Sequence, residues 1–342
     1  MKLMSRQETV PDQEARIAFL RQPQTYPEKP ARVETIETHM SWVFLTPQHA
    51  FKLKKPVRYD YLDFSTVAAR KKNCEEERRL NQRLAPGVYL NVIPLTLDSD
   101  GAMRLGEPGE ILDWLVMMRR LPALRMLDSL IRQQALEPAD MHAVAEVLAH
   151  FYRESVMIEI GGEEYRRQYE HKVRINYEAL SDPAYGLSAS LVKTVHEAQI
   201  EFLNTAPELL ERRAMDGRIV EGHGDLRPEH VCVESPPVIF DRLEFSHAFR
   251  LIDPADELAF LAMECERLGA PQVEVELFGA YRRVTGDYPP PQLVFFYKMQ
   301  RACLRARLAI WHVHDHAPST WPRWRAVAEE YLRLAEGYRE KF

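Results

Sequence analysis

Polar residues between positions 223 and 241 have the types and the spacing that phosphoryl transfer requires. The stretch HGDLRPEH (223–230) carries a carboxylate at Asp225 and a cation at Arg227. An apolar run with one acidic residue, VIFD, follows it and places Asp241 eleven positions after His230. Phosphoryl transfer needs a carboxylate that orients the acceptor hydroxyl, cations on the γ-phosphate and a second carboxylate for Mg²⁺. Asp225, Arg227 and Asp241 could fill these three roles.

The same residues carry a resemblance to a known family. Their spacing matches the H-R-D-x-x-x-x-N loop of protein kinases, which a hairpin and a metal-binding Asp follow. With Gly224 after the histidine, the loop resembles more narrowly the aminoglycoside phosphotransferase and choline kinase-like family. DPADELAFL (253–261) is similar to the segment in which an Asp-Pro pair of that family opens a helix behind the loop. The resemblance extends over about residues 31–310.

Two further segments resemble a bacterial, uncharacterised subgroup of these phosphotransferase-like proteins, some of which are fused to an ATPase module. The segments are SWVFLTPQHAFKLKKPVRYDYLDFST and RLNQRLAPGVYLNVIPLT. The chain contains no G-x-x-x-x-G-K-[ST] sequence, which is the phosphate-binding loop of such ATPases. We therefore expect no fused module in this chain.

The resemblance implies roles for the residues of the loop. Asp225 would orient the acceptor hydroxyl, Arg227 would reach the γ-phosphate, and Asp241 and His230 would bind the metal. His230 stands where the family has an asparagine, and its imidazole nitrogen is a softer ligand than the oxygens that Mg²⁺ prefers. We therefore expect ATP as the cofactor, together with Mg²⁺ or Mn²⁺.

The resemblance also implies a lysine on the third strand and a glutamate on the following helix, paired with each other and with the ATP phosphates. Lys52 and Lys54 alternate onto one face of a strand. We prefer Lys52, because Ala50 two positions earlier leaves room for the adenine. Among the consecutive glutamates 75–77, Glu77 best matches the spacing to the next strand.

Three more residues complete the predicted nucleotide site. No glycine-rich loop precedes the first apolar strand, and Ser41 in THMS takes its place as a phosphate contact. Met117 and Met118 end the last strand of the predicted sheet and would form the hinge beside the adenine. All three assignments come from the resemblance.

Plainer interpretations exist for each feature. An isolated HGD is a common turn, since Gly and Asp favour loops. Lysines on a strand can be solvated edge residues that discourage aggregation, and a glutamate run usually marks a solvated helix face.

Arg301 and Arg305 on a late helix could bind an anionic acceptor, but we expect them to pair with carboxylates at Asp253, Asp256 or Glu257. His312, His314 and His316 alternate, which does not suit one face of a helix, so we interpret them as a helix C-terminus.

Length and composition bound the possible functions. The 342 residues suggest two domains or lobes. A net charge of -6 argues against nucleic-acid binding, no apolar stretch is long enough for a membrane, and the four cysteines lie far apart, as reduced thiols do. We expect a cytoplasmic protein that acts on a small-molecule hydroxyl acceptor. The oligomeric state stays open.

Hydrophobic periodicity predicts an α+β protein. We expect an N-terminal helix and connector over 1–30, a small antiparallel sheet with one inserted helix over 31–118, and a larger, mostly helical part over 119–342. Strands are predicted near 35–39, 42–45, 50–54, 88–96 and 111–121, with a helix from Ser65 to Leu84 capped by a Ser or an Asp. The resemblance implies that the two parts are the lobes of a protein kinase-like fold.

The leading functional hypothesis is an ATP-dependent small-molecule kinase of the aminoglycoside phosphotransferase-like type. One alternative is a catalytically weak or inactive, pseudokinase-type nucleotide-binding module, motivated by His230. A metal-dependent hydrolase with His223, Asp225 and His230 as ligands is a third hypothesis, which leaves Lys52 and Glu77 without roles.

Overall fold

The computed structural model describes residues 11–59, 62–315 and 318–341. The chain forms two compact units. The first contains the residues up to Ala123 together with Val238–Ser246, and the second contains Leu124–Pro237 and the residues from His247 onward. The segment 238–246, which the sequence division placed with the helical part, therefore belongs to the β-rich unit.

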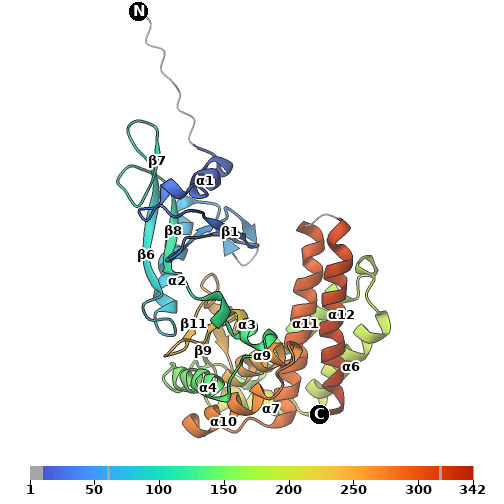
Figure 1. Ribbon diagram of the computed structural model, residues 1–342. Helices are drawn as coiled ribbons and strands as arrows, with labels where there is room; N and C mark the ends of the chain where they lie inside the picture. The colour runs from blue at the N-terminus through green and yellow to red at the C-terminus, as the bar shows by residue number, and fades with distance from the viewer. Residues whose placement is uncertain (1–10, 60–61, 316–317, 342) are drawn as a thin grey trace, which may run out of the picture. The chain divides into compact units, whose positions relative to one another are not determined.

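A six-stranded antiparallel sheet is the centre of the first unit (Figure 1). Its strand order is β1-β2-β3-β8-β6-β7. The strands are β1 (Glu34–Glu37), β2 (Ser41–Leu45), β3 (His49–Lys54), β6 (Tyr89–Leu97), β7 (Met103–Leu105) and β8 (Glu110–Arg119). All five predicted strands are present in this sheet. The sixth strand, β7, was not predicted, because an edge strand of three residues is too short to give a periodic signal. β4 (Arg58–Tyr59) and β5 (Leu62–Asp63) form a separate small pair.

The two faces of this sheet differ in chemistry. Phe51 and Leu53 of β3 belong to a hydrophobic cluster that includes Ile17 and Leu20 of α1 (Gln13–Leu20). The alternate residues of β3 lie on the opposite face, because successive side chains of a strand point to opposite sides. That opposite face contacts α2 (Val67–Asn81) and carries the lysines.

The inserted helix α2 begins later than predicted. Its N-cap is Thr66, whose side chain accepts a hydrogen bond from the Ala69 N–H at 3.1 Å. Ser65 cannot serve as the cap, because its N–H and hydroxyl both donate to Asp63 Oδ1. The buried face of α2 is mostly polar, which hides it from a hydropathy pattern; it consists of Arg70, Cys74, Glu77, Leu80 and Asn81.

The second unit is mostly helical, as predicted. Its helices are α3 (Leu127–Arg132), α4 (Pro138–Arg153), α5 (Gly162–Leu180), α6 (Ala189–Thr205), α7 (Pro207–Met215), α8 (His247–Arg250), α9 (Pro254–Arg267), α10 (Val273–Thr285), α11 (Pro291–Asp315) and α12 (Trp321–Gly337). Pro207 separates α6 from α7, since proline has no N–H to continue a helix. α11 and α12 lie side by side (Figure 1) and share a core with α5, α6 and α9.

Short strands flank the loop 223–230. β9 (Val220–Glu221) pairs with β12 (Leu251–Ile252), and β10 (Val231–Cys232) follows the loop in the second unit. β11 (Val238–Ile239) begins the segment that belongs to the first unit.

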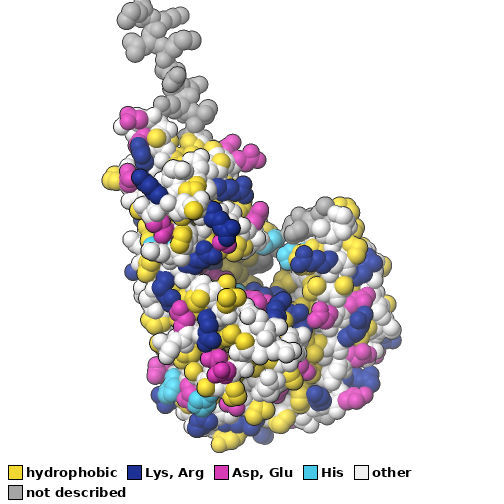
Figure 2. Space-filling model, viewed as in Figure 1, with side chains coloured by type: hydrophobic (Ala, Val, Ile, Leu, Met, Phe, Trp, Pro, Cys, Tyr) yellow, Lys and Arg dark blue, Asp and Glu magenta, His cyan; other side chains and the backbone are white. Residues whose placement is uncertain are grey.

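The face of the molecule drawn in Figure 2 shows no segregation of charge that would suit a polyanion. On the face drawn in Figure 2, basic and acidic side chains are interspersed over each unit. Within the described ranges, no helix is both long enough and apolar enough to cross a bilayer.

Candidate active site

Glu257 holds the backbone of the loop 223–230. It lies in the first turn of α9, is fully buried, and accepts hydrogen bonds from the N–H groups of His223 (2.9 Å) and Gly224. The Tyr152 hydroxyl donates to the same carboxylate at 2.9 Å. Burial raises the pKa of Glu257, and these donors offset only part of that effect. Sequence reasoning considered Glu257 only as a partner for an arginine and missed this role.

Two glycines allow the close approach of loop and helix. A Cβ on Gly222 would lie 2.5 Å from Glu257 Oε2 and 2.5 Å from Ile252, so no side chain fits there. Gly224 has a φ of +92°, in the region that favours glycine. The glycines therefore bring the backbone to Glu257 and turn it toward Asp225.

His230 closes the loop onto itself. Its Nδ1–H donates to the backbone carbonyl of Asp225 at 2.8 Å, and Nε2 lies 3.2 Å from an Arg227 nitrogen, from which it can accept. Both ring nitrogens thus face protein groups. The structure gives His230 a loop-closing position; the predicted metal ligation would require the Arg227 guanidinium to move away.

Asp225 remains accessible at the surface of this loop. Its side chain is 34% exposed, and its Oδ2 accepts from Arg227 Nε at 3.2 Å. Burial favours the neutral acid, but Arg227 and His230 outweigh it and lower the pKa of Asp225. The carboxylate is therefore ionised at neutral pH and can accept a hydrogen bond from a hydroxyl.

A second group of charges lies in the first unit and contains the predicted lysine and glutamate. Lys52 Nζ is 2.8 Å from Glu77 Oε1 and 2.7 Å from Asp241 Oδ1. Burial by itself would lower the pKa of Lys52, but Asp241 and Glu77 raise it well above its ordinary value. The structure thus shows the predicted ion pair together with the carboxylate that was predicted to bind the metal.

Lys54 contacts the same glutamate from the other side. Its Nζ lies 2.5 Å from Glu77 Oε2 and 2.5 Å from Glu244 Oε1, and its side chain is only 1% exposed. β3 is an inner strand of the sheet, so the interpretation of these lysines as solvated edge residues is wrong. Sequence reasoning treated the two lysines as competitors, whereas the structure uses both. We call Lys52, Lys54, Glu77, Asp241 and Glu244 the charge cluster.

Only one of the three consecutive glutamates faces this cluster. Glu77 is fully buried, whereas Glu75 pairs with Lys71 at 3.7 Å and Glu76 pairs with Arg79 at 2.7 Å on the outside of α2. Lys52 and Lys54 lower the pKa of Glu77 against the effect of its burial. Glu77 therefore stays charged in the interior.

The segment that carries Asp241 is held by side chains of the first unit. Asp241 has a φ of +60°, a strained value for a residue with a side chain. The Tyr89 hydroxyl accepts from the Asp241 N–H at 3.0 Å, and Asn81 Oδ1 accepts from the Arg242 N–H at 2.9 Å. Such strain persists where the surroundings fix it and is concentrated at functional sites.

Several solved structures share this fold, among them proteins named as kinases or phosphotransferases. The structure superimposes on a choline/ethanolamine kinase family protein from Mesorhizobium loti with a TM-score of 0.51 and 15% identity, covering 94% of this chain and 99% of that one. It superimposes on the GDP complex of aminoglycoside 2'-phosphotransferase-IIIa with a TM-score of 0.54 and 16% identity, covering 97% and 100%. A choline kinase from Cryptosporidium parvum gives a TM-score of 0.51 at 10% identity, covering 95% and 93%.

The chain has the fold of aminoglycoside phosphotransferases and choline kinases. The predicted two-lobed kinase-like α+β fold is thereby confirmed. At these identities the likeness establishes the kinase-like fold and not the substrate.

Comparison of the amino-acid sequence with known proteins finds relatives but no matching family model. No protein-family model matches the chain. Uncharacterized proteins of Mycobacterium tuberculosis and Mycobacterium bovis are 32% identical over 283 residues, which is 81% of this chain and 54% of each relative. The chain therefore spans about half the length of the curated relatives that it matches.

The remaining predicted nucleotide contacts of the kinase-like fold divide between the two faces of the sheet. Ser41 pairs with Lys54 across β2 and β3 and lies on the lysine face, but it is only 3% exposed. Met118 pairs with Ala50 on that same face. Met117 pairs with Phe51 and packs into the hydrophobic cluster on the other face. The Met117 side chain is therefore misplaced as an adenine contact, because a strand alternates its side chains.

The arginines of α11 are engaged with carboxylates. Arg301 Nε lies 2.7 Å from Asp256 Oδ1, one of the predicted partners. Arg305 lies 2.8 Å from Glu264 Oε1, a residue that was not considered. The charge of Arg305 still reaches the loop 223–230, where it helps to lower the pKa of Asp225.

The histidines near the end of α11 do not support a metal tract. The His312 ring stacks on Trp324 with centroids 4.1 Å apart, and α11 ends at Asp315, as the helix C-terminus interpretation requires. His316 lies outside the described residues. Across the described ranges, no three His, Cys, Asp or Glu side chains are grouped to hold a metal ion. The hydrolase hypothesis therefore has no ligand cluster to support it.

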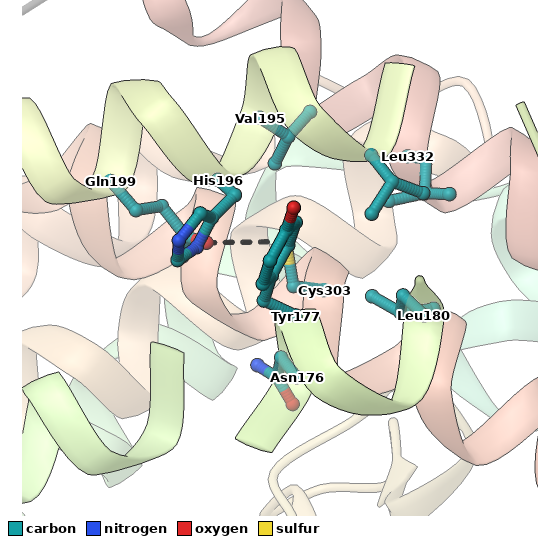
Figure 3. A pocket seen from close by; sticks show the side chains of 9 residues that line it. Asn176, Tyr177, Leu180, Val195, His196, Gln199, Cys303 and Leu332 are labelled. Carbon is teal, nitrogen blue, oxygen red and sulfur yellow. Dashed lines mark hydrogen bonds between the residues drawn. The ribbon is translucent and has the colours of Figure 1, made fainter. Parts of the chain in front are cut away.

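A small cavity lies between α5, α6, α11 and α12 of the second unit (Figure 3). Asn176 and Gln199 are each 2% exposed, and neither the Asn176 amide nor Gln199 Nε2 has a protein hydrogen-bond partner. Its volume of about 10 Å³ is near the minimum for a single water molecule. The cavity is therefore too small for a hydroxyl acceptor.

Proposed function

We propose that this protein is an ATP-dependent phosphotransferase that moves the γ-phosphate to a hydroxyl of a small molecule. The observation that carries the proposal is the contact of Lys52 with both Glu77 and Asp241. These partners are 25 and 189 positions away in the sequence. Phosphoryl transfer in the kinase fold uses a lysine, a glutamate and a metal-binding aspartate in these roles.

Each residue would act mainly by charge and position. Lys52 would bind the nucleotide phosphates while Glu77 orients it. Asp241, with a 37% exposed side chain, would hold Mg²⁺, which usually keeps only one or two carboxylate ligands beside phosphates and waters. The metal would neutralise charge on the phosphates. The lysine face near Ala50 and Met118 would receive the adenine.

The loop would supply the acceptor side. Asp225 is ionised and accessible, so it would accept a hydrogen bond from the acceptor hydroxyl, and Arg227 would stabilise charge on the transferred group. Such catalysis depends on preorganised charge and on orientation more than on covalent chemistry. Glu257 would contribute by fixing the loop backbone.

Asp225→Asn tests the proposal. Purified protein would be incubated with γ-labelled ATP, Mg²⁺ or Mn²⁺ and a metabolite extract, and labelled products would be separated. We expect the wild type to label a small molecule and Asp225→Asn to lose at least about 1000-fold in rate, while nucleotide binding stays within threefold. Asp128→Asn, at a partly buried aspartate of α3 that pairs with Arg132, is the matched control. Unchanged labelling by Asp225→Asn would refute the proposal.

One observation favours a second candidate, a nucleotide-binding module with weak or no catalysis. Both His230 nitrogens face protein groups, so the position that usually supplies a second metal ligand is engaged in the loop. Nucleotide binding in a thermal-shift series, with no labelled product over a broad acceptor panel and with either metal, would support this candidate.

The acceptor class and the compartment are part of the proposal. The mixed charge of the face drawn in Figure 2 and the net charge of -6 support a small-molecule acceptor over nucleic acid. The four cysteines are all free and buried, which suits a reducing cytoplasm.

A further inference from the structure

Lys54 is a second lysine in the charge cluster for which the phosphoryl-transfer scheme has no role. It cannot reach a nucleotide, because its side chain is 1% exposed and its ammonium group is bonded to Glu77 and Glu244. The ammonium also lies 5.2 Å from the centre of the Phe64 ring. A buried lysine is costly unless it is paired, so its retention calls for a function or a partner that needs it.

The partner that needs it is Glu77. In the structure Lys52 divides its hydrogen bonds between Glu77 and Asp241. A nucleotide with its metal would compete for both of these contacts, since phosphate attracts Lys52 and the metal attracts Asp241. Glu77 is fully buried and cannot follow either of them. Lys54 gives it a cation that no ligand can remove.

Lys54 also holds the segment that carries Asp241. Glu244 is three positions after Asp241, and its carboxylate is 8% exposed and bonded to Lys54. Burial raises the pKa of Glu244, and Lys54 offsets part of that effect. This contact adds to the hydrogen bonds that the N–H groups of Asp241 and Arg242 donate to Tyr89 and Asn81. Glu244 therefore acts as a tether to β3.

We propose that Lys54 is a positioning residue, which fixes Glu77 on one side and the Asp241 segment, through Glu244, on the other. The proposal rests on the nucleotide-binding part of the proposed function. Two ammonium groups and three carboxylates form the cluster, which leaves one negative charge in excess when all are ionised. A divalent cation at Asp241 would compensate that charge, so a variant that keeps one negative charge in excess tests the position of the ligands and not the net charge of the cluster.

The test measures how Mg²⁺ strengthens the binding of a fluorescent ATP analogue. The main variant is Lys54→Met combined with Glu244→Gln, which removes one positive and one negative charge and leaves Lys52, Glu77 and Asp241. We expect its apparent Mg²⁺ constant to rise at least tenfold, while nucleotide binding without metal changes less than threefold. Lys55→Met is the matched control, because Lys55 pairs with the exposed Glu37 outside the cluster, and its Mg²⁺ constant should stay within twofold.

Each outcome of this test decides something. A folded double variant with the wild-type Mg²⁺ constant would overturn the positioning role and leave Lys54 as a structural residue. If the double variant does not fold, Glu244→Gln alone decides, since a wild-type Mg²⁺ constant in that variant refutes the tether. A wild type that binds no nucleotide at all would instead refute the proposed function, and the Lys54 proposal would fall with it.

Discussion

The charge cluster of the first unit and the loop 223–230 of the second are built on opposite principles. In the cluster, charged side chains hold other charged side chains, and two lysines lower the pKa of Glu77. In the loop, the buried side chain of Glu257 holds backbone N–H groups. Its pKa is raised, because these neutral donors offset only part of the effect of burial. The cluster therefore preserves charge for a nucleotide and a metal, whereas the loop preserves a backbone shape from which Asp225 projects.

The largest expected effect is on the loop. Glu257→Ala would leave the His223 and Gly224 N–H groups and the Tyr152 hydroxyl without their acceptor inside the protein. We expect a loss of about 4 kcal/mol in the free energy of unfolding, measured with urea, because unsatisfied buried donors are costly. Glu276→Ala, at a half-exposed glutamate of α10, should change the free energy of unfolding by less than about 0.5 kcal/mol. Equal effects of the two variants would contradict the role given to Glu257.

A smaller loss is expected in the cluster. Glu77→Gln removes the carboxylate that Lys52 and Lys54 share, and breaking a buried ion pair costs roughly 3 kcal/mol. Asp241 and Glu244 remain as partners, which limits the damage. Urea unfolding would measure the effect, with the outward-facing Glu76→Gln as the neighbouring control. If Glu76→Gln cost as much as Glu77→Gln, the assignment of Glu77 as the inward residue would be wrong.

The two glutamates should respond to pH in opposite directions. The pKa of Glu77 is lowered in the folded protein, so its negative charge stabilises the fold at any pH above 4.5, the ordinary pKa of a glutamate. This stabilisation is lost as the pH falls below 4.5 and through the lowered pKa. The pKa of Glu257 is raised in the folded protein, so protonation of Glu257 stabilises the fold at low pH. This stabilisation is lost as the pH rises above 4.5 and through the raised pKa.

Glu77→Gln should therefore cost more at pH 7 than at pH 4, whereas Glu257→Gln should cost more at pH 4 than at pH 7. Urea unfolding of both variants and the wild type at the two pH values measures this. If the stability loss changed with pH in the same direction in both variants, the proposed difference between the cluster and the loop would be wrong.

The smallest expected effect concerns the last residue of the loop. His230→Asn restores an oxygen ligand of the kind that Mg²⁺ prefers. We expect nucleotide binding to need up to about tenfold less Mg²⁺, with little change for Mn²⁺, because the imidazole favours the softer metal. Titration of both metals against the fluorescent ATP analogue would show it. A weaker response to Mg²⁺ would indicate that loop closure by His230 matters more than ligand type.

The sequence alone supported the elements and the loop, because both depend on local signals. Alternation gave the strands, helical periodicity gave the long helices, and the spacing within HGDLRPEH belongs to one short segment. The partial failures were also local. Ser65 was considered as a cap although Asp63 engages it, and Met117 was grouped with Met118 although neighbours on a strand face opposite ways.

The tertiary structure decided which charges meet. Lys54 and Glu244 are 190 positions apart, and the polar inner face of α2 gives no hydropathy signal that Glu77 points inward. Likewise, Glu257 is 34 positions from the His223 N–H that it binds. Burial makes these contacts strong because it removes the competing water, and burial is a property of the packed chain. The sequence determined which groups could perform the chemistry, and the packing determined which of them stay charged and which partners hold them.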